Sequence, residues 1–189
     1  MTDSAVADHA ASDRSSRRAL LGAGVIGAAL ALTGTRSATA AATPGLSADD
    51  KSIATFAISL ELAARDLYDA AIEAGSSDDL WGVLREQHEA YATRIAGLAG
   101  LSANTRNDDV YDSLVEAFSV AEPIEAAQEL ENVAAATHIG LLGEIEAPRF
   151  AEIAASVASM ESRHSTVLGM VAGLSGDDLF LNPATPVEA

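Results

Sequence analysis

The sequence predicts an all-helical protein built as a four-helix bundle, and three observations lead to this prediction. Alanine is abundant, whereas aromatic residues make up only 4% of the chain. Alanine loses no side-chain entropy in a helix, while sheets favour branched and aromatic residues. Apolar residues recur at helical spacing in four long segments, and short turns join these segments in two pairs. We therefore expect two antiparallel helical hairpins.

The first hairpin is predicted to contain helices at residues 47–74 and 79–99. Ser47 and the acids that follow it suit a helix start, because side-chain oxygens and negative charge satisfy the first-turn amides. The second helix carries Leu84 and His88 on one face, together with Trp81, Tyr91 and Ile95. The turn between the two helices is short, so the helices should lie antiparallel.

The second hairpin is predicted at residues 123–146 and 148–173. Pro148 ends the first of these helices and suits the first turn of the next. The hairpins are separated by residues 101–122, which should include a short helix near 110–118. This connection is long enough to cross the length of a bundle, so the predicted topology is two hairpins joined by one long crossover.

The first 42 residues are predicted to be an export signal. Arg17 and Arg18 precede an apolar run at residues 19–32, and Ala38-Thr39-Ala40 is a small-residue cleavage site. This pattern resembles a twin-arginine signal, whose partner is the twin-arginine translocation machinery. We expect an exported protein that resides outside the cell, at its surface or in a periplasm. Cleavage of the signal and its retention as an anchor both remain open.

Charge and composition narrow the functions of the remaining chain, which we divide into a bundle at 43–175 and an acidic tail at 176–189. The net charge is −17, and removal of the export signal makes the chain more acidic still. Nucleic acid is therefore not an expected partner, since binding a polyanion needs a basic face. The chain has no cysteine, which excludes disulfides and thiolate metal sites. In the tail, Leu179, Phe180 and Leu181 are expected to dock on one end of the bundle.

Titratable residues interrupt the apolar faces of the predicted helices. Glu131 lies in the middle of the apolar face of the third helix, and Glu161 and His164 lie three residues apart on that of the fourth. A carboxylate and an imidazole at this spacing project toward the same point. Buried carboxylates are costly unless they are paired or bound to metal. These residues therefore indicate either a metal site or a hydrogen-bonded polar cluster.

Two stretches carry a resemblance to a known family. Residues 130–138, Leu-Glu-Asn-Val-Ala-Ala-Ala-Thr-His, and residues 153–164, which end in Glu-Ser-Arg-His, resemble helices three and four of bacterial ferritin-like domain proteins. Many proteins of that family carry export signals. The resemblance covers nearly all of the chain after the signal, and it implies a bundle that holds two metal ions between Glu and Glu-x-x-His ligands.

The resemblance assigns ligands residue by residue. Glu61 and Glu131 correspond to the single glutamates, although Glu61 lies at the edge of its apolar stripe. The second helix departs from the pattern, because His88 and Tyr91 stand where the family has Glu and His. The implied metal ligands are Glu61, His88, Glu131, Glu161 and His164, and they imply one iron or manganese ion, or two held weakly. Tyr68, Tyr91 and His138 are expected to surround these ligands, with the tyrosine hydroxyls reaching buried carboxylates.

Three functions are compatible with these features. The favoured one is a metal-binding ferritin-like protein, with oxidase or peroxide handling as candidate activities. The second is a metal-free bundle that acts as a structural or interaction module at the cell surface. The third, an iron-storage cage subunit, is the least favoured because export is unusual for a store. The sequence leaves homo-oligomer formation open.

Overall fold

The computed structural model describes residues 45–76 and 79–188, and this part of the chain is helical without strands. Its elements are α1 (Ala48–Glu73), α2 (Asp79–Ala99), α3 (Asp108–Phe118), α4 (Ile124–Leu141), α5 (Pro148–Val171) and the short 3-10 helix η2 (Gly176–Leu179). The predicted all-helical class is confirmed. The predicted export signal, with Arg17 and Arg18, lies outside the described residues. None of the described helices has the length and apolar character needed to cross a membrane.

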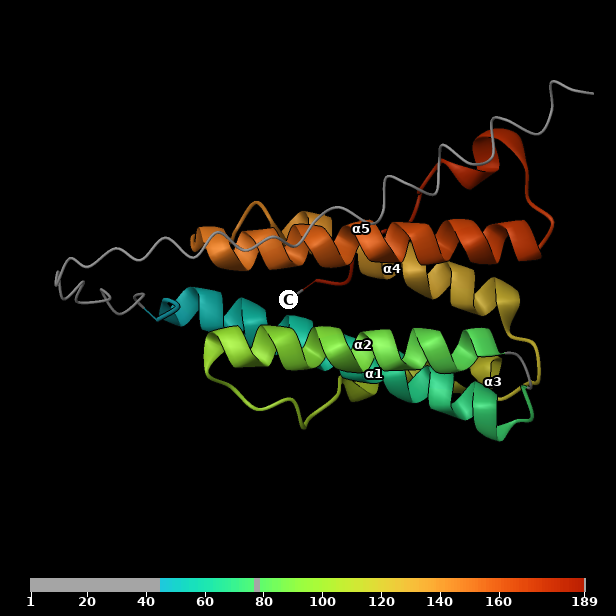
Figure 1. Ribbon diagram of the computed structural model, residues 1–189, viewed down its shortest axis with the longest axis horizontal. Helices are drawn as coiled ribbons and strands as arrows, with labels where there is room; N and C mark the ends of the chain where they lie inside the picture. Colours follow the sequence, from blue (N-terminus) through green and yellow to red (C-terminus); the bar gives the residue numbers. More distant parts are fainter. Residues whose placement is uncertain (1–44, 77–78, 189) are drawn as a thin grey trace, which may run out of the picture. The chain divides into compact units, whose positions relative to one another are not determined.

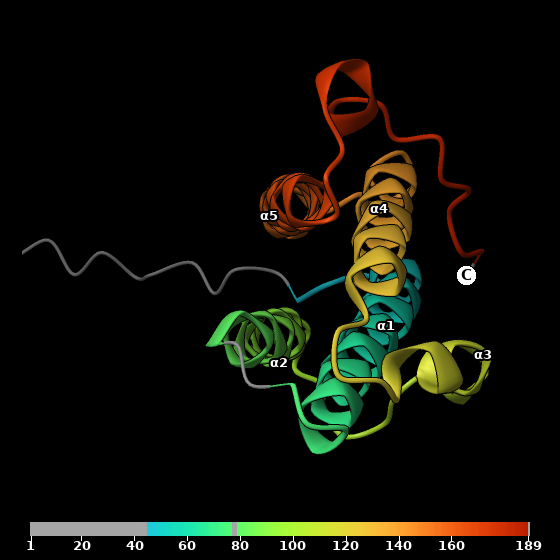
Figure 2. The same ribbon diagram turned by 90° about the vertical axis from the view of Figure 1, so that its right-hand side faces the viewer.

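The four long helices form a bundle of two hairpins. Helix α1 packs along α2, and α4 packs along α5 (Figure 1). Seen along the bundle, these four helices occupy its corners, while α3 lies outside them against α1 (Figure 2). The chain between the hairpins thus runs back along the bundle through α3, as the predicted crossover requires.

Local sequence signals set the ends of the first hairpin. The Ser47 hydroxyl accepts a hydrogen bond from the amide of Asp50 at 3.0 Å, which caps α1. Gly75 follows α1 with φ +103°, a conformation that strains any residue with a Cβ. The Ser76 amide then donates to the Ala71 carbonyl at 3.2 Å and closes the helix.

Asp50 ties the beginning of α1 to the beginning of α5. Its carboxylate is buried and accepts hydrogen bonds from the amides of Glu146 and Ala147, at 2.9 and 3.0 Å. Ala147 is the capping residue of α5 and has no side-chain acceptor of its own. An aspartate 97 residues earlier in the chain therefore supplies the cap and places a negative charge near the helix N-terminus.

The crossover is fixed to the middle of α1. The Asn107 side chain caps α3 by accepting from the Val110 amide at 3.0 Å, and the Asn107 amide donates to the Ser59 carbonyl at 2.9 Å. Arg106 lies 3.1 Å from Asp66 of α1, and its guanidinium lies 3.5 Å from the centre of the Tyr111 ring. These contacts hold α3 against the outer side of α1.

Two apolar clusters fill the bundle core. One includes Ile58, Leu62 and Ile95 from the first hairpin with Phe150 and Val157 from α5. The other contains Leu67, Tyr68, Trp81, Leu84, Phe118, Leu130 and Leu168. Apart from Asp50 at the start of α1, the buried polar residues of the long helices lie where the segments that contribute to the two clusters meet. The core therefore contains a polar layer between two apolar ones.

Two predictions are wrong, one about where a helix ends and one about how the tail docks. Helix α4 ends at Leu141 rather than at residue 146. Tight turns follow, in which the Gly143 amide donates to the Gly140 carbonyl and the Glu144 amide to the Leu141 carbonyl, and Asp50 holds the Glu146 amide. In the tail, Leu179 packs near Gly169 of α5, but Phe180 and Leu181 are 82% and 65% exposed. The tail instead bonds to α4, where the Val187 amide donates to the Thr137 hydroxyl at 2.9 Å.

We expect Asp50→Ala to lower the free energy of unfolding by about 2–3 kcal/mol, because two amides at the start of α5 lose their acceptor. Denaturant unfolding followed by circular dichroism measures this loss. The neighbouring Asp49 is exposed in the same helical turn, so Asp49→Ala is the matched control and should change stability by less than about 0.5 kcal/mol. Equal losses in both variants would contradict the capping role.

Candidate metal centre

Six titratable side chains converge in the polar layer of the core. Each has a relative exposure of 7% or less, and all four long helices contribute. They are Glu61 of α1, His88 of α2, Glu131 and His138 of α4, and Glu161 and His164 of α5. We call these six residues the Glu–His cluster.

Helical spacing explains why these residues meet. Glu161 and His164 are three residues apart on α5, so both side chains leave the same face of the helix. Glu131 and His138 are seven residues apart, which is two turns along one face of α4. His88 lies between the buried residues Leu84 and Ala92 of α2. These polar residues thus occupy positions on the buried faces of their helices, where an apolar residue would otherwise stand.

The cluster is an alternating chain of carboxylates and imidazoles. At one end, His138 Nδ1 lies 3.1 Å from Oε2 of Glu161, and His138 Nε2 lies 3.2 Å from Oε1 of Glu61. His88 continues the chain, with Nδ1 2.7 Å from Oε2 of Glu61 and Nε2 3.1 Å from Oε1 of Glu131. His164 Nδ1 then lies 3.2 Å from Oε2 of Glu131.

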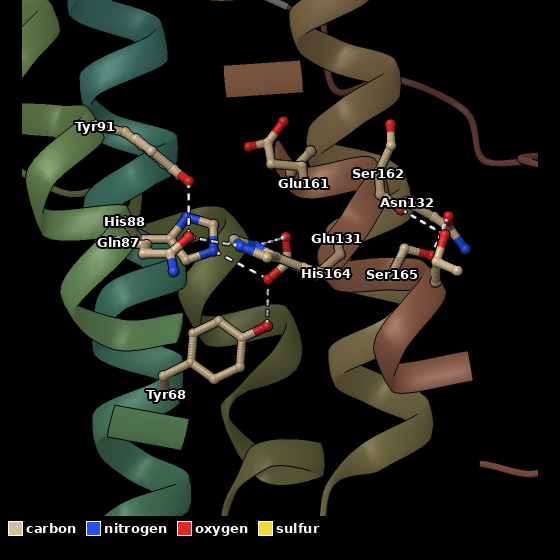
Figure 3. Close-up of polar contacts among 12 residues, drawn as sticks. Tyr68, Gln87, His88, Tyr91, Glu131, Asn132, Glu161, Ser162, His164 and Ser165 are labelled. Carbon is tan, nitrogen blue, oxygen red and sulfur yellow. Dashed lines mark hydrogen bonds and ion pairs between the residues drawn. The ribbon is translucent and has the colours of Figure 1, made fainter. Parts of the chain in front are cut away.

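Neutral side chains bind the other end of this series of carboxylates and imidazoles. His164 Nε2 lies 2.7 Å from Oε1 of Gln87, and the Tyr91 hydroxyl donates to the same oxygen at 3.0 Å. The Tyr68 hydroxyl donates to Oε1 of Glu131 at 2.6 Å. Figure 3 shows the Glu131 carboxylate joined by dashed lines to the rings of His88 and His164, with the Tyr68 hydroxyl pointing at it.

Every imidazole of the cluster faces an oxygen atom with both of its ring nitrogens. A neutral imidazole has one N–H and one lone pair, so it can donate to only one of two such oxygens. The second nitrogen then faces a carboxylate or carbonyl oxygen with no positive group between them. His88 and His138 face carboxylates with both nitrogens, so each of these two rings calls for a second proton or for a metal ion.

Two carboxylate oxygens in the cluster have no hydrogen-bond partner. These are Oε1 of Glu61 and Oε1 of Glu161, and His138 Nε2 also lacks a bond of good geometry. All three residues line a cavity of about 20 Å³, which is large enough for one water molecule. The cavity is bounded on one side by Val187 of the tail and by Thr137, to which the tail is bonded.

Ligand atoms gather closely enough for a metal ion at two places. One group consists of His88, Glu131 and His164, and the other of Glu61, His88 and Glu161. Within each group, one potential ligand atom from every residue lies within 4.8 Å of the others. Imidazole and carboxylate together suit iron, manganese and zinc.

Comparison with known proteins gives one match. The ferritin-like domain family matches residues 49–174, which is more than half of the chain. This chain belongs to the ferritin-like domain family. No curated protein and no solved structure matched it. The family match spans α1 to α5, so it includes every residue of the Glu–His cluster.

This ferritin-like bundle brings together all five residues predicted as metal ligands, although their role as ligands stays a prediction. Glu61, expected at the edge of a stripe, is 1% exposed and central. His138, expected behind the ligands, contacts Glu61 and Glu161 directly. Its distance from Glu131 along α4 had suggested a peripheral place, but it is the neighbouring helices α1 and α5 that provide its partners.

Of the side chains around the ligands, Tyr68 makes the predicted contact, Tyr91 does not, and Gln87 makes a contact that was not predicted. Tyr68 donates to a buried carboxylate as predicted. Tyr91 does not, because its hydroxyl is partly buried and donates to Gln87 instead. Sequence reasoning missed Gln87, which precedes His88 and turns toward α5 to meet His164. The only sequence signal for this contact was that a neutral amide side chain precedes an inward-facing histidine. Many helices have that pattern without a hydrogen bond between the amide and a neighbouring helix.

Charge pairing shifts the pKa values of the cluster strongly. Burial alone would lower the pKa of His138, but the carboxylates of Glu161 and Glu61 outweigh it and raise that pKa to about 9. The pKa of His88 is likewise raised well above its usual value by Glu131 and Glu61 despite burial. Burial would raise the pKa of Glu131, yet His88 and His164 lower it to about 2.

Glu161 and Tyr68 shift in the direction that keeps them protonated. Burial raises the pKa of Glu161 to about 7, with like charge from Glu61 adding to the rise and His138 opposing it. Burial and the Glu131 carboxylate together raise the pKa of Tyr68 well above 10, so its hydroxyl remains a donor. Without metal, protons on His88, His138 and Glu161 thus help to hold the cluster together.

We expect the stability of the metal-free protein to be highest near pH 4.5, to fall as pH rises from there through about 9, and to fall again at lower pH. The pKa of His138 is raised from 6.5 to about 9, so its contribution is complete below pH 6.5 and is lost as pH rises through 9. The pKa of Glu161 is raised from 4.5 to about 7, so its contribution is complete below pH 4.5 and is lost as pH rises through 7. The pKa of Glu131 is lowered from 4.5 to about 2, so its contribution is lost as pH falls through that range.

The alkaline decrease can be measured by denaturant unfolding in a chelator between pH 6 and 9.5. The contribution of His138 corresponds to about 3 kcal/mol, since one pKa unit is about 1.4 kcal/mol. His138→Asn should flatten the decrease by a similar amount. An unchanged decrease in that variant would show that the cluster does not hold the protonated imidazole.

Proposed function

We propose that this ferritin-like bundle binds a divalent metal ion, iron or manganese, in its Glu–His cluster. The observation that carries the proposal is the pair of buried, unpartnered carboxylate oxygens of Glu61 and Glu161 beside a small cavity. An isolated buried acceptor costs about 1–3 kcal/mol, and more when it is charged. A cation in this cavity would remove that cost.

The donor set fits such an ion. The ligands would be drawn from Glu61, His88, Glu131, Glu161 and His164, with His138 as a further imidazole close to the cavity. Tyr68 and Gln87 would orient Glu131 and His164 through their hydrogen bonds. An iron or manganese ion held there would supply redox chemistry, so oxidase and peroxide-handling activities are the ones to assay.

One observation favours the alternative of a metal-free structural or interaction module. Each carboxylate of the cluster already lies within 3.2 Å of at least one imidazole nitrogen. With all three rings protonated, the cluster would be electrically balanced without metal. Metal content distinguishes the two proposals directly.

We expect the purified protein to contain about one iron, manganese or zinc ion per chain, measured by elemental analysis before and after reconstitution. Glu131→Gln combined with Glu161→Gln should lose the ion, because each candidate ligand group loses one carboxylate. The matched control is Glu129→Gln with Glu152→Gln, two exposed acids on the same helices. Absence of metal from the parent protein after reconstitution would leave the metal-free module.

We also propose that the protein is exported by the twin-arginine machinery, on the strength of Arg17, Arg18 and the apolar run that follows. This route carries folded proteins, so an ion could be bound before export. Arg17→Lys with Arg18→Lys should leave the protein inside the cell in a fractionation experiment, while Arg14→Lys, outside the pair, should not. Equal export of the two variants would contradict the proposal.

A further inference from the structure

The two candidate ligand groups share one side chain, His88. The first group adds Glu131 and His164, and the second adds Glu61 and Glu161. His88 Nε2 faces Glu131 and its Nδ1 faces Glu61, at 3.1 and 2.7 Å. The two groups therefore meet opposite edges of a single imidazole ring.

The His88 ring is held in this orientation. It stacks on Tyr68 with ring centres 5.5 Å apart, and the edge of Tyr91 packs against it at 5.9 Å. The ring has no exposed surface. It cannot turn to present the same nitrogen to both groups, because each nitrogen is fixed toward its own carboxylate. Figure 3 shows the ring between Tyr91 on one side and Tyr68 on the other.

A neutral imidazole offers one lone pair to a metal ion, since its other nitrogen carries a proton. We propose that the two ligand groups are alternative positions for one divalent cation, because both groups draw on the same His88 ring. This inference rests on the proposed function, because it concerns how the same cluster holds its ion.

The arrangement differs from a paired-metal centre for a geometric reason. Ions in two-metal sites lie about 3.5–4 Å apart, and carboxylates that contact both ions hold them there. The two oxygens of a carboxylate lie on the same side of the group, whereas the two nitrogens of an imidazole point away from each other. With His88 rather than a carboxylate at this position of α2, this side chain cannot bridge two ions at that separation.

The two positions differ in ligand chemistry. His88, Glu131 and His164 offer two nitrogens and a carboxylate, while Glu61, His88 and Glu161 offer one nitrogen and two carboxylates. Nitrogen-rich sites suit zinc, copper and iron, and oxygen-rich sites suit manganese. Co²⁺ accepts both kinds of ligand, and its visible absorption reports the ligands around it. It is therefore the probe that can fill either position.

The test is a titration of the metal-free full chain with Co²⁺, followed by calorimetry and visible absorption. We expect one ion per chain in the parent protein. We also expect one ion per chain in Glu61→Gln and in Glu131→Gln, because each variant leaves the other group intact. The two variants should give different absorption spectra. The double variant should lose binding at concentrations that saturate the parent.

Controls separate ligand loss from misfolding. Glu73→Gln and Glu129→Gln alter exposed acids on α1 and α4 and should bind as the parent does. All variants are checked by circular dichroism and thermal unfolding without metal. If either cluster variant fails to fold, Glu161→Gln replaces Glu61→Gln and His164→Asn replaces Glu131→Gln, because each belongs to the same group.

The outcomes are distinguishable. Two Co²⁺ ions per chain in the parent would overturn the alternative positions and leave metal binding in place. Loss of all binding in one single variant, with the other binding normally, would show a single position and would also overturn them. A parent protein that binds no Co²⁺ would instead contradict the proposed function itself.

Discussion

The structure depends on how the neighbouring imidazoles offset the negative charge of three carboxylates that are buried in the core of a helical bundle. Charges of this kind are too costly to bury without partners. The chain meets this requirement by alternating Glu and His across all four long helices, so that no two carboxylates are direct neighbours in the series of contacts. Apolar clusters above and below keep water out and make each of these charge contacts stronger.

This compensation links stability and function in one set of residues. His88, whose pKa is raised in the metal-free protein, is also a nitrogen ligand of the proposed centre. A metal ion that enters the cluster must therefore replace protons, and the balance between the two depends on pH. The raised pKa of His88 on α2 adds positive charge to the metal-free state, beside the carboxylates of Glu61 and Glu131.

Sequence patterns predicted the fold well, because hairpin turns and apolar stripes are local features. They also identified His88, Glu131, Glu161 and His164 as inward-facing, since each interrupts a stripe, whereas Glu61 was assigned by the resemblance to the family. What the patterns could not supply was contact between helices. His138 contacts Glu61 and Glu161 only because α4 lies between α1 and α5 at that level. The Asp50 cap on α5 and the bond from Gln87 to His164 likewise join residues far apart in the chain.

Trp81 gives the cluster an internal optical signal. It is the only tryptophan of the chain, it is 1% exposed, and its ring centre lies 6.1 Å from that of Tyr68. Tyr68 in turn donates its hydroxyl hydrogen to Glu131. The emission of a single buried indole, one side chain away from the charged groups, will respond to their field and will be quenched by a paramagnetic ion. The natural protein thus reports the state of its own core by fluorescence, without any added label.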